Sequence, residues 1–192
     1  RNNITIDSST DFSPIGLSGE VISEFTGSLS GTVQNLASNG TNISTSRYQI
    51  TLNLSTSVED GENYYSALFA RIGEGGDVSD LDINVSFNTS GITASADNGS
   101  LNIGAIAGIN NGTISGVNVY INSTNSSNTI FSYDRINVDI NFGGVVGINN
   151  GYIDLTTSNV IYSSRLEITS SSSSDHNIGS VAGANNGEII GG

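Results

Sequence analysis

The chain has 192 residues, with 24 glycines, one proline and no cysteine, methionine or tryptophan, and its 18 acidic and 5 basic side chains give a formal net charge of -13. The lack of cysteine excludes disulfides, thiolate nucleophiles and cysteine zinc sites, and the single histidine, His176, excludes a two-histidine metal motif. All five basic residues are arginines, so lysine chemistry is excluded, and the acidic surface would repel the phosphates of a nucleic acid.

Apolar and polar residues alternate in several short segments along the chain. Asn3–Asp7 is the first, and the others follow at residues 50–54, 81–87, 117–122 and 136–142. β-Branched residues at every second position are typical of strands with one buried face. No segment approaches the run of about 20 apolar residues that spans a bilayer. The sequence therefore predicts an all-β protein without a membrane-spanning helix.

Three segments align with one another without gaps. They are Ile103–Ile114, Phe142–Ile153 and Ile178–Ile189, and each contains Gly-x-Asn-Asn-Gly-x-Ile. A degenerate fourth copy, Tyr65–Val78, keeps the small apolar residues but has a longer glycine turn. Glycine would weaken a helix here by about 1 kcal/mol per residue, so we expect strand, turn, strand, with Asn-Asn-Gly supplying residues that tolerate positive φ.

Repeated strands can form a sandwich or a solenoid, and near-identical copies favour the solenoid because stacked coils impose one environment on each position. We expect a right-handed parallel β-helix of about five coils, triangular, with three short strands per coil. Irregular loops are expected at residues 88–101, 123–134 and 169–176. The inward ladder of the core should contain six aliphatic residues, namely Ile106, Val145, Val181, Ile114, Ile153 and Ile189.

The repeated polar and glycine positions are the candidate structural site. The asparagines should stack as an amide ladder, and Gly108, Gly147 and Gly183 should let a strand pass closely by a corner or a neighbouring side chain. The alternative is that Asn-Asn-Gly is only a hairpin turn signal. The residues concerned are Gly108, Asn110, Gly112, Gly147, Asn149, Gly151, Gly183, Asn185 and Gly187.

This Gly-x-Asn-x-Gly-x-Ile pattern resembles the GLUG motif of large secreted bacterial surface proteins, including haemagglutinin-like adhesins. Pro14–Gly16 and Phe25–Gly31 are similar to segments that precede the first repeat of such proteins. The large residue that usually follows the motif glycine is replaced at positions 109, 148 and 184. The resemblance implies a single β-helix domain over residues 1–192, with degenerate coils at 1–64, GLUG-like repeats at 65–192 and an extracellular location.

Neither end of the sequence shows a helix or a charged coil that would cap a solenoid. We therefore expect either an excised segment or subunits that stack end to end through exposed strand edges.

Carbohydrate-active enzymes also use this fold, but the sequence does not favour catalysis. Glycoside hydrolysis needs two carboxylates across one groove, and the aspartates at 77, 80, 82, 139 and 154 show no clustering with the arginines at 47, 71, 135 and 165. We expect no enzyme and a solvated acidic face. No cofactor is expected, although calcium ligands are conceivable at Glu74, Asp77, Asp80 and Asp82, or at Glu59, Asp60 and Glu62.

Several Asn-x-Ser/Thr sequons are glycosylation candidates in a glycosylating host, although the composition also produces them by chance. They include those that start at Asn3, Asn42, Asn53, Asn84, Asn88, Asn122 and Asn125. His176 is expected in a solvated loop, and Tyr120 and Tyr152 either pack at coil corners or offer a sugar-stacking surface.

The sequence thus predicts a non-enzymatic, secreted or cell-surface structural protein, an adhesive β-solenoid. Its expected partners are copies of itself, stacked end to end into filaments, or a host or cell-surface glycan or protein, with no nucleic acid and no membrane insertion. The alternative is a carbohydrate-binding or carbohydrate-processing β-helix.

Overall fold

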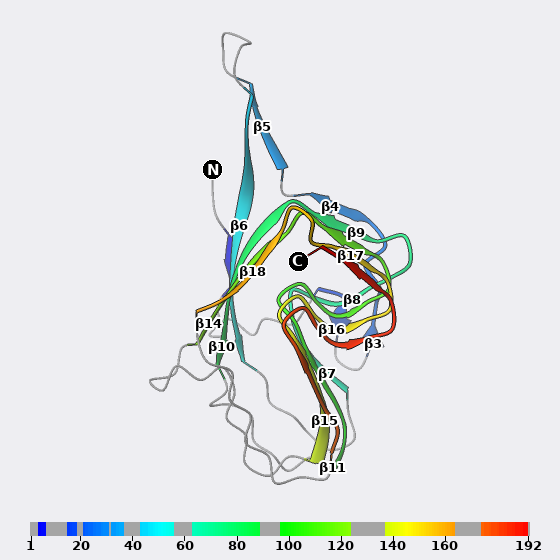
Figure 1. Cartoon of the computed structure of the whole chain (residues 1–192). Coiled ribbons are helices and arrows are strands. Elements are labelled where there is room, and N and C mark those ends of the chain that lie inside the picture. The colour runs from blue at the N-terminus through cyan, green and yellow to red at the C-terminus, as the bar shows by residue number, and fades with distance from the viewer. Residues whose placement is uncertain are drawn as a thin grey trace.

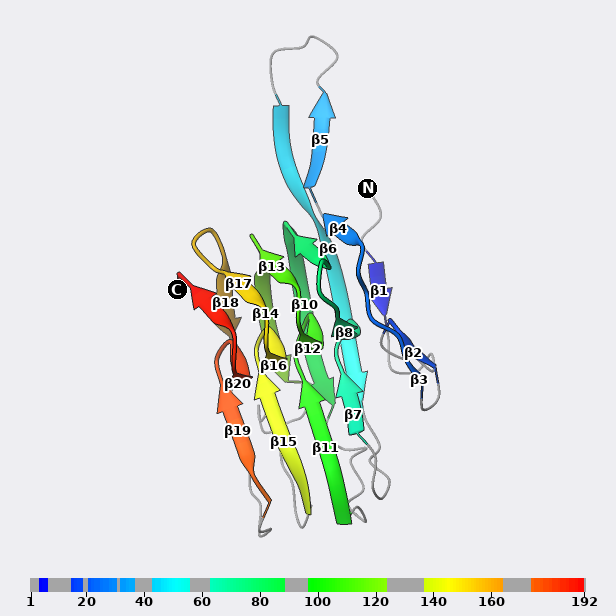
Figure 2. The same ribbon diagram turned by 90° about the vertical axis from the view of Figure 1, so that its right-hand side faces the viewer.

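A computed structural model shows an all-β chain wound as a right-handed parallel β-helix (Figures 1 and 2). The structure describes residues 4–6, 15–18, 21–30, 32–36, 43–55, 63–88, 97–123, 137–163 and 174–191. Successive coils lie over one another, and the strands of each coil pair in parallel with those of the next. The predicted fold class, a short β-solenoid, is confirmed.

Each regular coil has four strands rather than the three that we predicted. The first complete coil contains β7 (Asn63–Ser66), β8 (Phe69–Ile72), β9 (Asp77–Ser79) and β10 (Leu81–Asn88). The second contains β11 (Asp97–Ile103), β12 (Ala107–Asn110), β13 (Thr113–Ser115) and β14 (Asn118–Ser123). The extra strand arises because the chain bends sharply at Gly104–Ile106, which divides the apolar segment into β11 and β12.

The third coil repeats the same order. It contains β15 (Asn137–Gly143), β16 (Val146–Asn149), β17 (Tyr152–Asp154) and β18 (Asn159–Tyr162). The last strands are β19 (His176–Gly179), β20 (Ala182–Asn185) and β21 (Glu188–Ile190). Strands β11 and β19 begin inside segments that we had predicted to be loops, at residues 88–101 and 169–176. The predicted loop at 123–134 lies outside the described residues, apart from Ser123, the last residue of β14.

Residues before the first complete coil contribute shorter pieces to the same stacks. β4 (Ser28–Ser30) pairs in parallel with β9, and β6 (Ile43–Ser55) pairs in parallel with both β10 and β1 (Ile4–Ile6). Two antiparallel pairings depart from the coil: β5 (Thr32–Leu36) with β6, and β2 (Leu17–Ser18) with β3 (Val21–Ile22). In Figure 1, β5 and the start of β6 project away from the stack.

The register places equivalent residues of the three aligned segments over one another. Ile114 pairs with Ile153, and Ile153 pairs with Ile189. The degenerate copy occupies the layer below, because Val78 pairs with Ile114 and Ile72 pairs with Asn110. The aligned segments are therefore stacked columns and not successive hairpins.

The core lies inside the coils. Ile106, Val145, Ile114 and Ile153 are fully buried, and Val181 and Ile189 pack against this cluster while partly buried at the end of the stack. The six aliphatic residues predicted for the inward ladder are therefore core residues. Along β10, the alternating Leu81, Ile83 and Val85 are buried, as the period of two predicted.

Candidate functional site

The predicted ladder positions form a buried column of amides, which we call the inner ladder: Asn110, Asn149 and Asn185. The Nδ2 of Asn110 donates to the Oδ1 of Asn149 at 2.8 Å, and the Nδ2 of Asn149 donates to the Oδ1 of Asn185, also at 2.8 Å. Asn110 and Asn149 are fully buried. Because a buried polar group without a partner is costly, this column needs asparagine, whose amide both donates and accepts.

The inner ladder also secures the turn that follows each asparagine. The backbone N–H of Gly112 donates to the Oδ1 of Asn110 at 3.1 Å, and the Nδ2 of Asn110 lies 3.3 Å from the carbonyl oxygen of Gly112. Asn149 makes the corresponding contact to the carbonyl oxygen of Gly151. One side chain thus satisfies its own turn and links it to the next coil.

A second amide column, the strand ladder, consists of Asn102, Asn141 and Asn177, and we did not predict it. The Nδ2 of Asn141 donates to the Oδ1 of Asn102 at 2.9 Å, and the Nδ2 of Asn177 donates to the Oδ1 of Asn141 at 3.0 Å. The sequence does contain the signal, because each of these asparagines stands eight residues before an inner-ladder asparagine. Each of the three aligned segments begins at the residue directly after one of these asparagines.

A third column begins with a carboxylate, and we call it the Asp82 column: Asp82, Asn118 and Asn159. The Nδ2 of Asn118 donates to the Oδ1 of Asp82 at 2.7 Å, and the Nδ2 of Asn159 donates to the Oδ1 of Asn118 at 3.0 Å. Asp82, which we had considered as a catalytic or calcium-binding carboxylate, is therefore held in a structural hydrogen bond.

The repeated glycines are required by close packing, and the role that we predicted for the turn glycine was wrong. A Cβ on Gly147 would lie 2.7 Å from the carbonyl oxygen of Gly108, and a Cβ on Gly151 would lie 2.2 Å from the carbonyl oxygen of Gly112. Among the described residues, positive φ occurs at other positions, and Asp80 is the one non-glycine residue that adopts it. The Asn-Asn-Gly turn therefore selects glycine for the space between coils and not for its backbone conformation.

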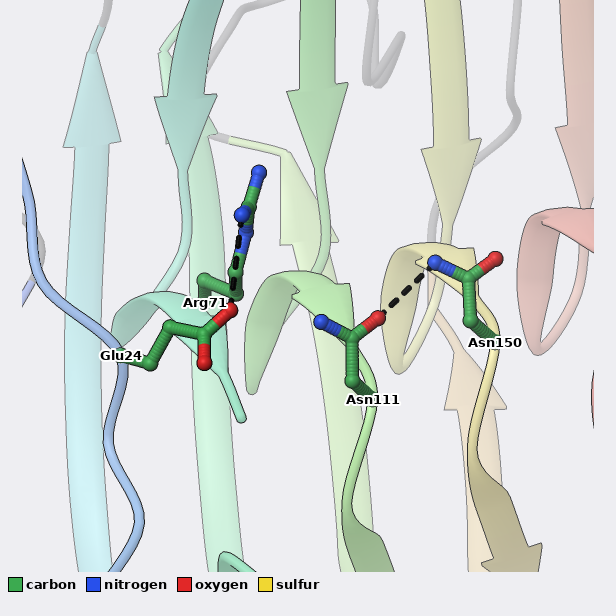
Figure 3. Close-up of polar contacts among 4 residues, drawn as sticks. All are labelled: Glu24, Arg71, Asn111 and Asn150. Carbon is green, nitrogen blue, oxygen red and sulfur yellow. Dashed lines mark hydrogen bonds and ion pairs between the residues drawn. The ribbon is translucent and has the colours of Figure 1, made fainter. Parts of the chain in front are cut away.

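The outward side of the same turns carries a fourth column, the outer ladder: Asn111, Asn150 and Asn186. Figure 3 shows the Nδ2 of Asn150 donating to the Oδ1 of Asn111, at 2.9 Å, and Asn186 donates to Asn150 at 3.0 Å. Towards the N-terminal side of this surface, Arg71 reaches Glu24 with 3.5 Å between Nη1 and Oε1. Both side chains of this ion pair are partly exposed, so it contributes little stability. The surface is therefore a solvated polar face.

Tyr152 lies beside the outer ladder on β17. Its pKa is raised by desolvation on the sheet surface and then by the negative charges of Asp154 and Glu188. Asp154 accepts hydrogen bonds at its Oδ1 from the hydroxyl and the backbone N–H of Thr156, at 2.7 and 2.8 Å, and these bonds lower its pKa. An aromatic ring and two carboxylates thus lie close together on one outward face, two residues along the chain from Asn150, which suits recognition of hydroxyl-rich ligands.

The remaining carboxylates that we had considered do not meet at one point. Asp80 stands at a coil corner with φ of 56°, and Asp139 accepts a hydrogen bond from the backbone of Asp175. Within the described segments, no group of three or more histidine or acidic residues is placed to hold a metal ion, and this includes the candidates Glu74 and Asp77. The second calcium candidate, Glu59, Asp60 and Glu62, lies outside the described residues.

Two of the seven sequons named above can be placed by their side chains. Asn84 faces outward, half-buried, on β10, and Asn122 accepts a hydrogen bond from the Ser163 hydroxyl. Asn53 and Asn88 lie in β6 and β10, where only the backbone is described, and Asn3, Asn42 and Asn125 lie outside the described residues.

His176 was predicted in a solvated loop, and this was wrong. It is the first residue of β19, paired with Ile140, and its Nε2 is buried without a hydrogen-bond partner in the described part of the chain. Tyr120 lies between Asn84 and Ile161 on the outward side of its sheet. Tyr162 faces the opposite side; its hydroxyl donates to the carbonyl oxygen of Ser180 at 2.9 Å, and burial raises its pKa.

Comparison with known proteins does not place this chain in a family. No family model matches the sequence, and no curated protein or solved structure matches it significantly. The resemblance to GLUG repeats therefore stays a prediction that rests on the motif residues. In the segments that the structure describes, no helix is long and apolar enough to cross a membrane.

Proposed function

We propose that this chain is a non-enzymatic structural and adhesive segment of a secreted or cell-surface protein. The observation that carries the proposal is the continuous stacking of side-chain amides along the axis, in the inner ladder, the strand ladder and the outer ladder. Such columns hold successive coils in one register, which is the property of a scaffold that must present the same outward groups at a fixed spacing.

The outward face supports an adhesive role. Asn111, Asn150 and Asn186 repeat there at the spacing of stacked strands, about 4.8 Å, and Tyr152 lies next to them with Asp154 and Glu188 nearby. An ordered row of amides with one aromatic ring can bind a surface through many weak contacts, and multivalent display multiplies such contacts.

The test is adhesion of beads coated with the whole chain. We expect beads to bind a cell surface or one another, and a variant carrying Asn150→Ala and Tyr152→Ala to bind at least about tenfold less, because both residues are outward and their contacts are repeated across the bead. The matched control is Ser115→Ala, on the same face in β13. Equal adhesion of all coated beads and of uncoated beads would refute the adhesive role.

The alternative function is carbohydrate binding, and it is favoured by the position of Tyr152 close to two carboxylates, Asp154 and Glu188. A glycan array distinguishes the two proposals. Selective micromolar binding to one glycan that is lost in Tyr152→Ala would support a carbohydrate-binding β-helix. Adhesion without selectivity for a glycan would favour the structural and adhesive role.

A further inference from the structure

The turns of the outer ladder place an asparagine directly before a glycine. Close packing selects the glycine, because a Cβ on Gly151 would collide with the backbone of Gly112 in the preceding coil. Stacking selects the asparagine, because its amide accepts from one neighbour and donates to the one in the preceding coil. The stack therefore repeats the Asn-Gly dipeptide at its surface, as Asn111–Gly112, Asn150–Gly151 and Asn186–Gly187.

An Asn-Gly dipeptide can modify itself in water. The backbone nitrogen of the glycine loses its proton and attacks the side-chain carbonyl carbon of the asparagine, ammonia leaves, and a cyclic succinimide forms. Water then opens the ring at either of its carbonyl carbons. The product is aspartate or isoaspartate, and in isoaspartate the main chain runs through the side chain. The amide and a water molecule thus become a carboxyl group and ammonia, without oxidation or reduction. Glycine favours the attack because it has no Cβ beside the nitrogen.

The folded turn at Asn150 keeps the reacting atoms apart. The N–H of Gly151 donates to the carbonyl oxygen of Asn110 in the preceding coil, at 3.0 Å, so the nitrogen is directed inward and keeps its proton. The carboxamide of Asn150 donates to Asn111 at 2.9 Å and accepts from Asn186 at 3.0 Å, so it is directed along the column (Figure 3). Ring closure has to break these bonds, which requires a local opening of the turn.

The equivalent turn of the preceding coil is held in a different way. The N–H of Gly112 donates to the Oδ1 of Asn110, in its own turn, at 3.1 Å. This local bond can persist when neighbouring coils separate, whereas the bond of Gly151 spans the coils and cannot. Asn150 should therefore respond more strongly than Asn111 to an opening of the stack.

The products at position 150 fit the stack differently. Aspartate leaves the main chain unchanged and alters only an exposed side chain, whose partner water can replace. Isoaspartate lengthens the main chain by a methylene group just before Gly151. The carbonyl oxygen of Gly151 accepts from the N–H of Glu188, and the N–H of Tyr152 donates to the carbonyl oxygen of Gly112, both at 2.9 Å. A longer main chain cannot keep both bonds in a turn that has no room even for a Cβ.

We propose that Asn150 is a self-modifying site. It forms a succinimide with Gly151 only while its turn is separated from the preceding coil, and the isoaspartate that results keeps the turn out of the stack. The reaction thus converts a transient opening of the solenoid into a permanent one. This property goes beyond the adhesive role, and its test does not depend on adhesion.

The test compares the whole chain in native buffer and in urea concentrated enough to unfold it, both at the same mildly alkaline pH. Peptide mapping by mass spectrometry follows the conversion of each asparagine and separates aspartate from isoaspartate. We expect Asn150 to react at least about tenfold more slowly in native buffer than in urea, because reaction in the fold needs a local opening. Equal rates in the two solutions, or no reaction at Asn150 in urea, would overturn the proposal.

Variants that loosen the coils test whether separation controls the reaction. Gly147→Ala, which pushes the coils apart, should raise the native rate at Asn150 by about threefold or more, and by a larger factor than the rate at Asn111. Asn149→Ala removes a side-chain link between the same coils and should act in the same direction, so it replaces Gly147→Ala if that variant does not fold. Ile161→Ala, on the outward side of β18, is the matched control and should leave both rates within about twofold. An unchanged rate at Asn150 in a folded, loosened variant would contradict the proposed control.

The fate of the products is tested on the refolded chain. A sample that has partly reacted in urea is returned to native buffer and digested briefly with a protease, and the undigested fraction is mapped. Isoaspartate at position 150 should be depleted from this fraction at least about tenfold relative to aspartate at the same position, because an open turn is cleaved first. The Asn150→Asp variant identifies the aspartate peptide and should itself resist digestion. Equal survival of the two forms would show that the isoaspartate turn returns to the stack, and would overturn the proposal.

Discussion

The turn at Asn149–Asp154 has an inward and an outward side that differ in what their residues do. Asn149 and Ile153 are fully buried, whereas Asn150 is exposed. Asn149 and Asn150 are adjacent and chemically identical, and both stack on an asparagine of the neighbouring coil. The two asparagines differ in their access to water. Water can hydrogen-bond to the exposed amide of Asn150 in place of its partner, but it cannot reach the buried amide of Asn149. Stability should therefore depend on the inward side, which leaves the outward side free to vary with function.

The largest expected effect on stability comes from truncating the central side chain of the buried isoleucine column, which consists of Ile114, Ile153 and Ile189. Ile153→Ala should lower the free energy of unfolding by about 2–5 kcal/mol, because Ile114 and Ile189 above and below cannot close the void. Chemical denaturation measures this. The matched control is Ile161→Ala, since Ile161 is 45% exposed on the outward side of β18, and it should cost less than about 1 kcal/mol. Equal losses in the two variants would contradict the assignment of inside and outside.

The next largest effect on stability is expected at the stacked glycines Gly108, Gly147 and Gly183. Gly147→Ala should cost about 1–3 kcal/mol or more, because the new Cβ would lie 2.7 Å from the carbonyl oxygen of Gly108 and 2.8 Å from the nitrogen of Ile103, both of which are backbone atoms. Gly27→Ala is the control, because its Cβ would meet only the ring of Phe25, at 3.4 Å. A change in the melting temperature as small as that of the control would show that the coils can separate to accept a methyl group.

The inward and outward sides of the turn can be compared most directly at the adjacent residues Asn149 and Asn150. Asn149→Ala should destabilise the chain by about 1–3 kcal/mol, because it leaves the buried Nδ2 of Asn110 without its acceptor in the next coil. Asn150→Ala, one residue away, should change stability by no more than about 0.5 kcal/mol, as expected for an exposed position. Parallel urea titrations of the two variants give the difference directly, and equal values would show that the inner ladder adds nothing beyond the outer one.

The periodicity of the sequence predicted the fold and part of the candidate site. Alternation in β10 and β14 and the three aligned segments were sufficient for a parallel solenoid with Asn110 stacked on Asn149, because both depend on pattern alone. The bend at Gly104 was not predictable in this way, since a short apolar run does not reveal where it changes direction. The role of Gly151 was misread because a turn glycine and a glycine beneath a neighbouring carbonyl look the same in sequence.

The strand ladder and the direction of each ladder needed the structure for another reason. Asn102 stands in an alternating strand, where an asparagine is normally read as an outward polar residue, and only the register of β11 with β15 shows it stacked and buried. Direction depends on single neighbours, such as the hydroxyl of Ser100 and the carboxylate of Asp82. A sequence pattern contains these residues but not which of their atoms face each other.

The smallest expected effect belongs to the outward end of the turn. Asp154 is partly exposed, and its pKa is lowered by hydrogen bonds from the hydroxyl and the backbone of Thr156. A carboxyl with a lowered pKa in the folded state stabilises that state above its unfolded pKa, about 3.9, and this contribution is lost as the pH falls through the folded value. NMR titration of the Asp154 carboxyl should give a pKa below that of a free aspartate, and Thr156→Val should raise it while retaining the backbone bond. If the pKa does not respond to Thr156→Val, solvent already replaces the Thr156 hydroxyl. The hydrogen bond between the Thr156 and Asp154 side chains would then not be formed in solution.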